Sequence, residues 1–110
     1  MPIYITKGCY TAAAVQGMIA KPEDRSDELN RLLNAVGGKL LGLYYTFGEH
    51  DFLAIGEAPG EKELATALLA AAAGGSVTNL TTTVAISAAE MKQSFANAAP
   101  VVAKFRSAGK

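Results

Sequence analysis

Few residues in this 110-residue chain are suited to chemistry, and the most prominent is His50, the only histidine. An unperturbed imidazole titrates at about pH 6.5, so His50 is a candidate general acid or base. Asp51 follows it directly, but neighbouring residues on a strand point to opposite faces, so the sequence implies no His-Asp pair. The alternative interpretation is a turn histidine that is exposed to water, and both remain open.

The turn that holds His50 contains two residues with expected structural roles. We expect Asp51 to cap this turn, because Asp side chains accept hydrogen bonds from nearby backbone N–H groups. A catalytic carboxylate is the alternative reading of Asp51. Gly48 is expected to supply a backbone angle that other residues resist.

Cys9, the only cysteine, is a second candidate for chemistry. A reactive thiolate needs a positive environment, which Lys7 or the start of the following helix could supply. The alternative is a small buried hydrophobic residue, which is how most lone cysteines behave. One cysteine cannot form an internal disulfide.

The tyrosines are the third group of candidates. Tyr4 and Tyr10 fall on one face of the first predicted strand, and Tyr44 and Tyr45 on opposite faces of the second. A tyrosine that lines a cavity could orient a carbonyl or phenol through its hydroxyl. The alternative is a tyrosine that fills a subunit interface with its amphipathic ring.

The sequence offers no pattern for a bound metal or cofactor. One histidine and one cysteine cannot supply a usual ligand set alone. Gly37 and Gly38 follow a predicted helix rather than a strand, which is the wrong order for a dinucleotide-binding loop. Arg25, Arg31 and Lys39 could attract an anion but are interpreted as a solvated helix face.

Composition excludes several classes of protein. Ten basic and ten acidic residues cancel, which argues against a nucleic-acid binder or an anionic-membrane binder. The longest apolar stretch, Leu64 to Gly75, is too short to span a bilayer. No basic leader with an apolar core opens the chain, so we expect a soluble, cytoplasmic protein.

Hydrophobic patterns and breakers predict the elements that position these residues. Strands are expected over 2–10, 39–47, 52–58 and 77–86, and helices from 12, from 61 and from 88. Thr11 and the Ser87-x-x-Glu90 pattern are predicted helix caps. Pro22 interrupts the first helix and is suited to begin a new one, and Pro100 is expected to bend or end the last.

The clearest periodic signal is an apolar stripe of Leu29, Leu32, Leu33 and Val36, which Gly37-Gly38 ends as a C-cap pair. The short Gly48–Asp51 connection makes the second and third strands a hairpin. The order β-α-β-β-α-β predicts a ferredoxin-like α+β fold, an antiparallel sheet with helices on one face. We expect a single domain, 1–110, with a core of about 1–90 and a C-terminal helical extension of about 88–106.

The middle strands are apolar on both faces. Strict alternation places Leu41, Leu43, Tyr45 and Phe47 on one face and Leu40, Gly42, Tyr44 and Thr46 on the other. In the third strand, Leu53 and Ile55 oppose Phe52, Ala54, Gly56 and Ala58. Because soluble monomers rarely expose a large apolar patch, the second face should be covered by the C-terminal helix or, as we prefer, by a second subunit.

Several short motifs occur in the order found in one family. They are Ile3-Tyr4-Ile5, Tyr10-Thr11, Gly37-Gly38-Lys39, Gly48-x-x-Asp51 followed by Phe52-Leu53-Ala54-Ile55, and Glu57-Ala58-Pro59. Over roughly residues 1–90 the chain therefore resembles GYD-domain proteins, of the dimeric α+β barrel superfamily. The resemblance implies a dimer whose subunits pair their sheets. The family turn is usually Gly-x-Tyr-Asp, and here His50 stands in place of the tyrosine.

Two functions from different classes fit these residues. The first is a homo-oligomeric module for assembly or for binding a small hydrophobic molecule, without catalysis. The second is a cofactor-free enzyme, similar to monooxygenases or isomerases, that acts on a small hydrophobic or aromatic molecule; it would use His50, Tyr10, Tyr44 and Cys9. A cavity between sheet and helices that receives His50 or a tyrosine would favour the enzyme, whereas a packed sheet interface with His50 in water would favour the module.

Overall fold

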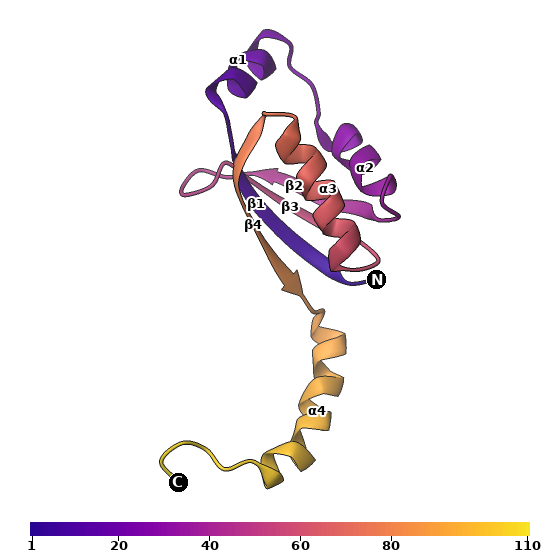
Figure 1. Ribbon diagram of the computed structural model, residues 1–110, viewed down its shortest axis with the longest axis vertical. Coiled ribbons are helices and arrows are strands. Elements are labelled where there is room, and N and C mark those ends of the chain that lie inside the picture. Colours follow the sequence, from indigo (N-terminus) through magenta and orange to yellow (C-terminus); the bar gives the residue numbers. More distant parts are fainter.

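A computed structural model describes all residues from 1 to 110, and it shows one four-stranded sheet. The elements in chain order are β1 (Ile3–Tyr10), α1 (Ala12–Ala20), α2 (Ser26–Asn34), β2 (Lys39–Tyr45), β3 (Phe52–Glu57), α3 (Glu61–Ala73), β4 (Val77–Ala85) and α4 (Ala88–Lys104). The strand order is β2-β3-β1-β4, and every neighbouring pair is antiparallel. Helices α2 and α3 lie over one face of the sheet (Figure 1). The predicted ferredoxin-like α+β fold is therefore confirmed.

The first connection contains two helices, separated by a non-helical segment from Lys21 to Arg25. The Thr11 hydroxyl accepts a hydrogen bond from the backbone N–H of Ala14 at 3.2 Å, which confirms the predicted cap of α1. Helix α2 begins only at Ser26, whose N–H donates to Asp24 Oδ1 at 2.9 Å. The prediction that Pro22 begins a helix is wrong, because this side-chain hydrogen bond offers the backbone an alternative to the helical turn.

The core is small and lies between the sheet and helices α2 and α3. Its buried residues are Tyr4, Leu33, Ala58, Leu64 and Ala67, with Leu32, Val36, Leu40 and Leu68 packed against them. The predicted stripe is therefore the inner face of α2 and of the turn that follows it.

The glycine pair after α2 ends the helix as predicted. The Gly38 N–H donates to the carbonyl of Leu33 at 2.9 Å, and Gly37 has a φ of 86°. A left-handed residue just past the last turn is typical of a helix C-cap. Gly38 also lies so close to β3 that an added Cβ would collide with the carbonyl oxygen of Glu57.

A bulge changes which side chains of β2 face the helices. Leu40 lies opposite Gly56 and Gly42 opposite Ile55, so β2 has one extra residue, Leu41, at this point. The extra residue interrupts the alternation, and Leu40 shares the helix-covered face with Leu43. The prediction that these two leucines lie on opposite faces is wrong, because strict alternation holds only where no bulge intervenes.

The second face of the sheet is covered by no element of this chain (Figure 1). The strand register defines what we call the open face, which comprises Ile3, Ile5 and Lys7 of β1, Leu53, Ile55 and Glu57 of β3, Lys39 and Tyr44 of β2, and Thr81, Thr83 and Ala85 of β4. Tyr44 is 60% exposed and Leu53 is half-buried. The open face therefore combines an apolar group with the charged side chains of Lys7, Lys39 and Glu57 and with threonines along β4.

Helix α4 extends away from the sheet rather than across it (Figure 1). It begins as predicted, because the Ser87 hydroxyl accepts from the N–H of Glu90 at 3.2 Å. It has no buried residue, and Phe95 and Val102 are exposed. Pro100 lies inside the helix, which continues to Lys104, so Pro100 does not end it.

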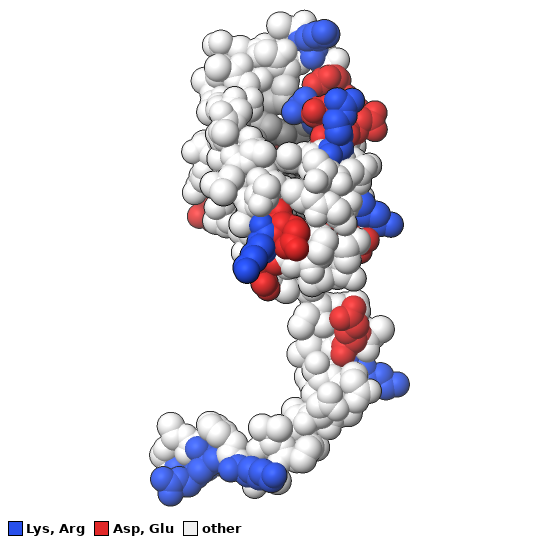
Figure 2. Space-filling view, turned by 45° about the vertical axis from the view of Figure 1, so that its right-hand side comes forward, with Lys and Arg blue, Asp and Glu red and all other residues white.

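Charged groups are distributed unevenly along the molecule. Acidic and basic side chains are intermixed on the main body, whereas the C-terminal end carries only basic ones (Figure 2). None of the helices combines the length and hydropathy needed to cross a membrane.

Candidate functional site

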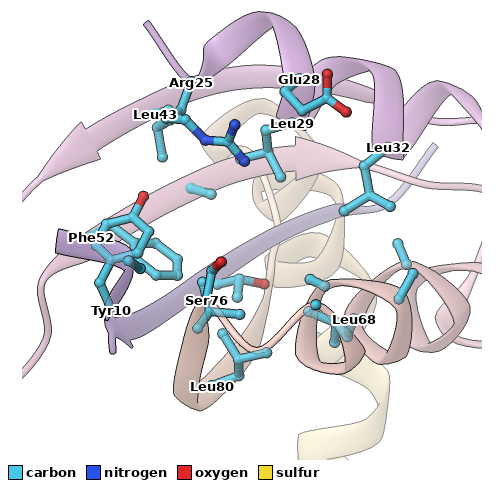
Figure 3. A pocket seen from close by; sticks show the side chains of 18 of the residues that line it. Tyr10, Arg25, Glu28, Leu29, Leu32, Leu43, Phe52, Leu68, Ser76 and Leu80 are labelled. Carbon is cyan, nitrogen blue, oxygen red and sulfur yellow. The ribbon is translucent and has the colours of Figure 1, made fainter. Parts of the chain in front are cut away.

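A cavity of about 890 Å³ lies between the helix-covered face of the sheet and helices α1, α2 and α3. Eighteen of the 29 residues that line it are hydrophobic. Its apolar wall includes Leu29 and Leu32 of α2, Leu43 of β2, Phe52 of β3, Leu68 of α3 and Leu80 of β4 (Figure 3). Cavities of this size and composition are typical of sites for small organic molecules.

The space exists because the chain puts small side chains where a core would otherwise be filled. Ala13, Ala14 and Gly17 are the small residues that α1 contributes to the wall, and α1 has no buried residue. The alanine-rich helix α3 contributes Ala67, Ala70 and Ala71 in the same way. In Figure 2 the surface is hollowed beside a group of intermixed charged side chains.

Tyr10 brings a phenol to the cavity, at the point where β1 ends. Its ring lies 5.0 Å from that of Phe52 and 6.0 Å from that of Tyr45, measured between centroids. Burial raises the pKa of Tyr10, and hydrogen bonding with Tyr45 and the negative charge of Asp51 raise it further. The Tyr10 phenol is therefore neutral at physiological pH and can donate or accept a hydrogen bond.

Arg25 brings a positive charge to the same end of the cavity. Its guanidinium reaches over the cavity between Tyr10 and Leu29 (Figure 3). Its Nη1 donates to Glu23 Oε1 at 2.8 Å, and this hydrogen bond raises the pKa of Arg25. The guanidinium has five donors, so one partner leaves others free to bind a ligand.

Tyr4 lies deeper in the cavity wall, within the core. The residue is 3% exposed, and its hydroxyl is buried without a hydrogen-bond partner. Burial raises the pKa of Tyr4, as do the negative charges of Glu61 and Glu63. A buried polar atom without a partner is costly, and this hydroxyl has almost no accessible surface, so it lies behind the cavity wall rather than open to a bound molecule.

The structure separates the predicted site residues. Tyr10 lines the cavity, together with Tyr4 on the same strand face as predicted. His50 does not line it; the residue is half-buried in the turn before β3, where its carbonyl accepts from the Thr46 hydroxyl at 2.7 Å. Tyr44 lies on the open face, away from the cavity.

Asp51 has a different hydrogen-bond donor than expected, and Gly48 has a different backbone conformation. Asp51 Oδ2 accepts a hydrogen bond from the backbone N–H of Tyr10 at 2.9 Å. The carboxylate thus binds a backbone N–H as expected, but the donor belongs to β1 rather than to the turn. Gly48 has no positive φ, and an added Cβ would meet nothing within 4 Å. The prediction that its backbone angle requires glycine is wrong.

Cys9 lies half-buried beside the turn and away from the cavity. Its Sγ donates to the carbonyl of Glu49 at 3.5 Å and accepts from Asn79 Nδ2 at 3.9 Å. Asn79 has a φ of 54° at the point where the register of β1 and β4 shifts. The thiol therefore takes part in the contacts of this bulge.

Arg25 is the cavity residue that sequence reasoning assigned to solvent. Its four-residue spacing from Leu29 places it on the apolar side of α2, which was the available signal.

The cavity is equipped for an organic ligand. No group of three or more His, Cys, Asp and Glu residues is placed to hold a metal ion. The polar groups that line it include two phenols and a guanidinium, beside an apolar wall. This arrangement can bind a hydrophobic body through contact and a polar head through hydrogen bonds.

Comparison with known proteins supports the fold and identifies the family. No curated protein matches the chain. The crystal structure of FFRP-DM1 is similar with a TM-score of 0.49 at 16% identity, covering 78% of this chain and 100% of that one. A hypothetical protein from Pyrococcus horikoshii is similar with a TM-score of 0.50 at 17% identity, covering 79% and 92%, and it shares the fold. The family model of the GYD domain matches residues 4–95, from β1 into α4, so the chain belongs to the GYD domain family.

Proposed function

We propose that this GYD-domain chain is a homo-oligomeric module that binds a small hydrophobic molecule between its sheet and its helices. The observation that carries the proposal is the cavity of about 890 Å³ with its mainly hydrophobic wall. A ligand with an apolar body would remove this apolar surface from water, which is favourable roughly in proportion to the area buried, and would make dispersion contacts with the wall.

The polar groups at the Tyr10 end of the cavity support binding of a molecule that also carries polar atoms. The Tyr10 phenol and the Arg25 guanidinium both line the cavity there. Few, well-placed polar groups in an apolar pocket are what orient a small ligand. Burial raises the pKa of Tyr10, so its phenol is neutral and acts as a hydrogen-bonding group.

The open face supports self-association as the second part of the proposal. Its apolar side chains are uncovered in one copy, and α4, the one intramolecular alternative, extends away from the sheet. An isologous pair buries the same patch of both copies at once. Each cavity lies on the other face of its sheet, so two copies could pair and keep both cavities accessible.

Native mass spectrometry of freshly purified protein tests the ligand part. We expect a fraction of the protein to retain an organic molecule of low mass, which denaturing conditions release. Protein that carries no small molecule, and that binds none from a set of hydrophobic compounds, would contradict it.

Size-exclusion chromatography with light scattering tests the assembly part. We expect about twice the chain mass at micromolar concentration, and the chain mass for Ile55→Lys, which puts a charge on the open face. Thr66→Lys, at an exposed position of α3, is the matched control and should remain dimeric. A monomeric wild-type protein would contradict the proposal.

A cofactor-free enzyme is the second candidate, and Tyr10 is the observation that favours it. A neutral phenol beside an aromatic wall can donate to a carbonyl or phenol oxygen of a bound molecule. To test for catalysis, the small molecule recovered from the protein is incubated in air with fresh protein, and the mass of the small molecule is followed. A gain of oxygen would indicate a monooxygenase, and an unchanged mass with altered NMR signals an isomerase. An unaltered molecule favours the binding module.

A further inference from the structure

We propose that the ligand class is a small amphipathic acid, with an apolar body in the cavity and one carboxylate held by Arg25 and the Tyr10 hydroxyl. This inference rests on the proposed function and specifies its ligand. It depends on the unequal distribution of polar groups around the cavity. The charged groups that line it all come from the segment Lys21–Glu28, whereas the rest of the lining is uncharged and mainly apolar, with Thr6, Thr11 and Ser76 among its polar residues.

Arg25 is the charged group that is directed over the cavity. Figure 3 shows its guanidinium between Tyr10 and Leu29, while the Glu28 carboxylate lies higher, on α2. Glu28 also lines the cavity, and its Oε2 lies 3.5 Å from Nη1 of Arg31, a residue outside the lining. Glu23 occupies only Nη1 of Arg25. The remaining N–H groups of Arg25 match the planar geometry of a carboxylate.

Tyr10 supplies a second donor for the same head group. Its phenol lines the cavity at the end where Figure 3 shows the Arg25 guanidinium. A tyrosine hydroxyl carries one proton that rotates to suit its partner, so it can donate to an anion held beside it. Arg25 and Tyr10 thus offer donors to one head group from the same end of the cavity.

The apolar wall of the cavity determines which ligand bodies can bind. The ring of Phe52 lies beside that of Tyr10 in a tilted arrangement, and the wall also includes Leu29, Leu32, Leu43, Leu68 and Leu80. A ring or short branched chain fits such a surface, and a second charge there would lose its hydration without a partner. The inferred ligand is therefore a monoacid with an aromatic or aliphatic body.

Three probes that share a naphthalene body and differ in their terminal group test the inference on the purified full chain. They are 2-naphthylacetate, 2-(2-naphthyl)ethanol and 2-(2-naphthyl)ethylammonium, with binding followed by naphthalene fluorescence and by calorimetry. We expect the acid to bind at least about tenfold more tightly than the alcohol or the amine, as hydrogen bonds to a charged group imply. Equal or better binding of the alcohol or the amine would overturn the acid class and leave the cavity function standing. If none of the three probes binds, the result would contradict both the acid class and the proposed binding function of the cavity.

Variants locate the head group. Arg25→Gln should weaken binding of the acid at least about tenfold and leave the alcohol within about twofold, because the alcohol lacks the charge. Lys62→Gln removes the same charge from an exposed position of α3 outside the cavity and should leave acid binding unchanged. Tyr10→Phe keeps the ring and should weaken acid binding alone, which tests the site should Arg25→Gln not fold. Equal loss for acid and alcohol in both variants would overturn the inference.

Discussion

The carboxylate of Asp51 accepts a hydrogen bond from the backbone N–H of Tyr10 at 2.9 Å, although 41 residues separate them. This contact joins the turn before β3 to the last residue of β1, where the chain enters α1. The N–H of Asp51 also donates to the carbonyl of Gly8 at 2.8 Å. The turn that carries the family motif thus fixes the backbone of a cavity tyrosine, without entering the cavity itself.

Asp51→Ala should therefore destabilise the protein, by about 1–2 kcal/mol, because the Tyr10 N–H loses a charged acceptor. Urea denaturation followed by circular dichroism measures the change. His50→Ala is the matched neighbour and should stay within about 0.5 kcal/mol, because its side chain lies outside the cavity wall and only its carbonyl oxygen has a hydrogen bond, from Thr46. Equal losses in the two variants would contradict the assigned role of Asp51.

Two glycines that look alike in the sequence should respond oppositely to alanine. An added Cβ at Gly38 would collide with the Glu57 carbonyl, whereas Gly48 has open space and no positive φ. We expect Gly38→Ala to cost at least about 2 kcal/mol of unfolding free energy and Gly48→Ala to remain within about 0.5 kcal/mol. Thermal denaturation of both variants is the check. A larger loss for Gly48→Ala would show that the turn needs glycine after all.

The fold was predictable because its signals are local and repeat along the chain. The stripe from Leu29 to Val36 and the cap at Thr11 each depend on spacing within one helix, and both are found where predicted. The face of Leu40 was not predictable, because a bulge depends on the pairing of β2 with β3 rather than on either strand alone.

The cavity residues were harder to predict from the sequence than the fold, as three of the candidate residues illustrate. Tyr10 could be placed on the correct strand face by alternation, together with Tyr4. Arg25 had a usable signal in its four-residue spacing from Leu29, but a charged side chain is by default assigned to solvent. His50 is a candidate acid or base by residue type, yet the tertiary structure places it outside the cavity.

The core assignment predicts the effect of Leu33→Ala. Leu33 is 7% exposed within the central cluster, so truncation leaves a void and should cost about 2–5 kcal/mol. Leu69→Ala, at a leucine of α3 that is 71% exposed, is the control and should change stability by less than about 0.5 kcal/mol. Denaturant midpoints give both values. An unchanged midpoint for Leu33→Ala would place the core elsewhere.

Tyr4→Phe should remove a buried hydroxyl without a loss of stability. Because the Tyr4 hydroxyl is buried without a partner, its removal should leave the unfolding free energy of the protein unchanged or raise it. Urea denaturation followed by circular dichroism measures the change. A loss of stability above about 1 kcal/mol in Tyr4→Phe would show that the hydroxyl has a stabilising partner.

Tyr10 should make stability depend on alkaline pH. Burial is the main cause that raises its pKa in the folded protein, while an unfolded tyrosine titrates at about 10. The unfolded state then releases its proton first, so the stabilisation is fully present below about pH 10 and is lost as pH rises above it.

Denaturation between pH 8 and 11 should show a shallower decline for Tyr10→Phe than for wild type (a range chosen to bracket the tyrosine titration). Tyr44→Phe, at a residue of the open face that is 60% exposed and lies outside the cavity, is the matched control for removal of a tyrosine hydroxyl. Parallel curves for wild type and Tyr10→Phe would show that Tyr10 is not buried in the folded protein.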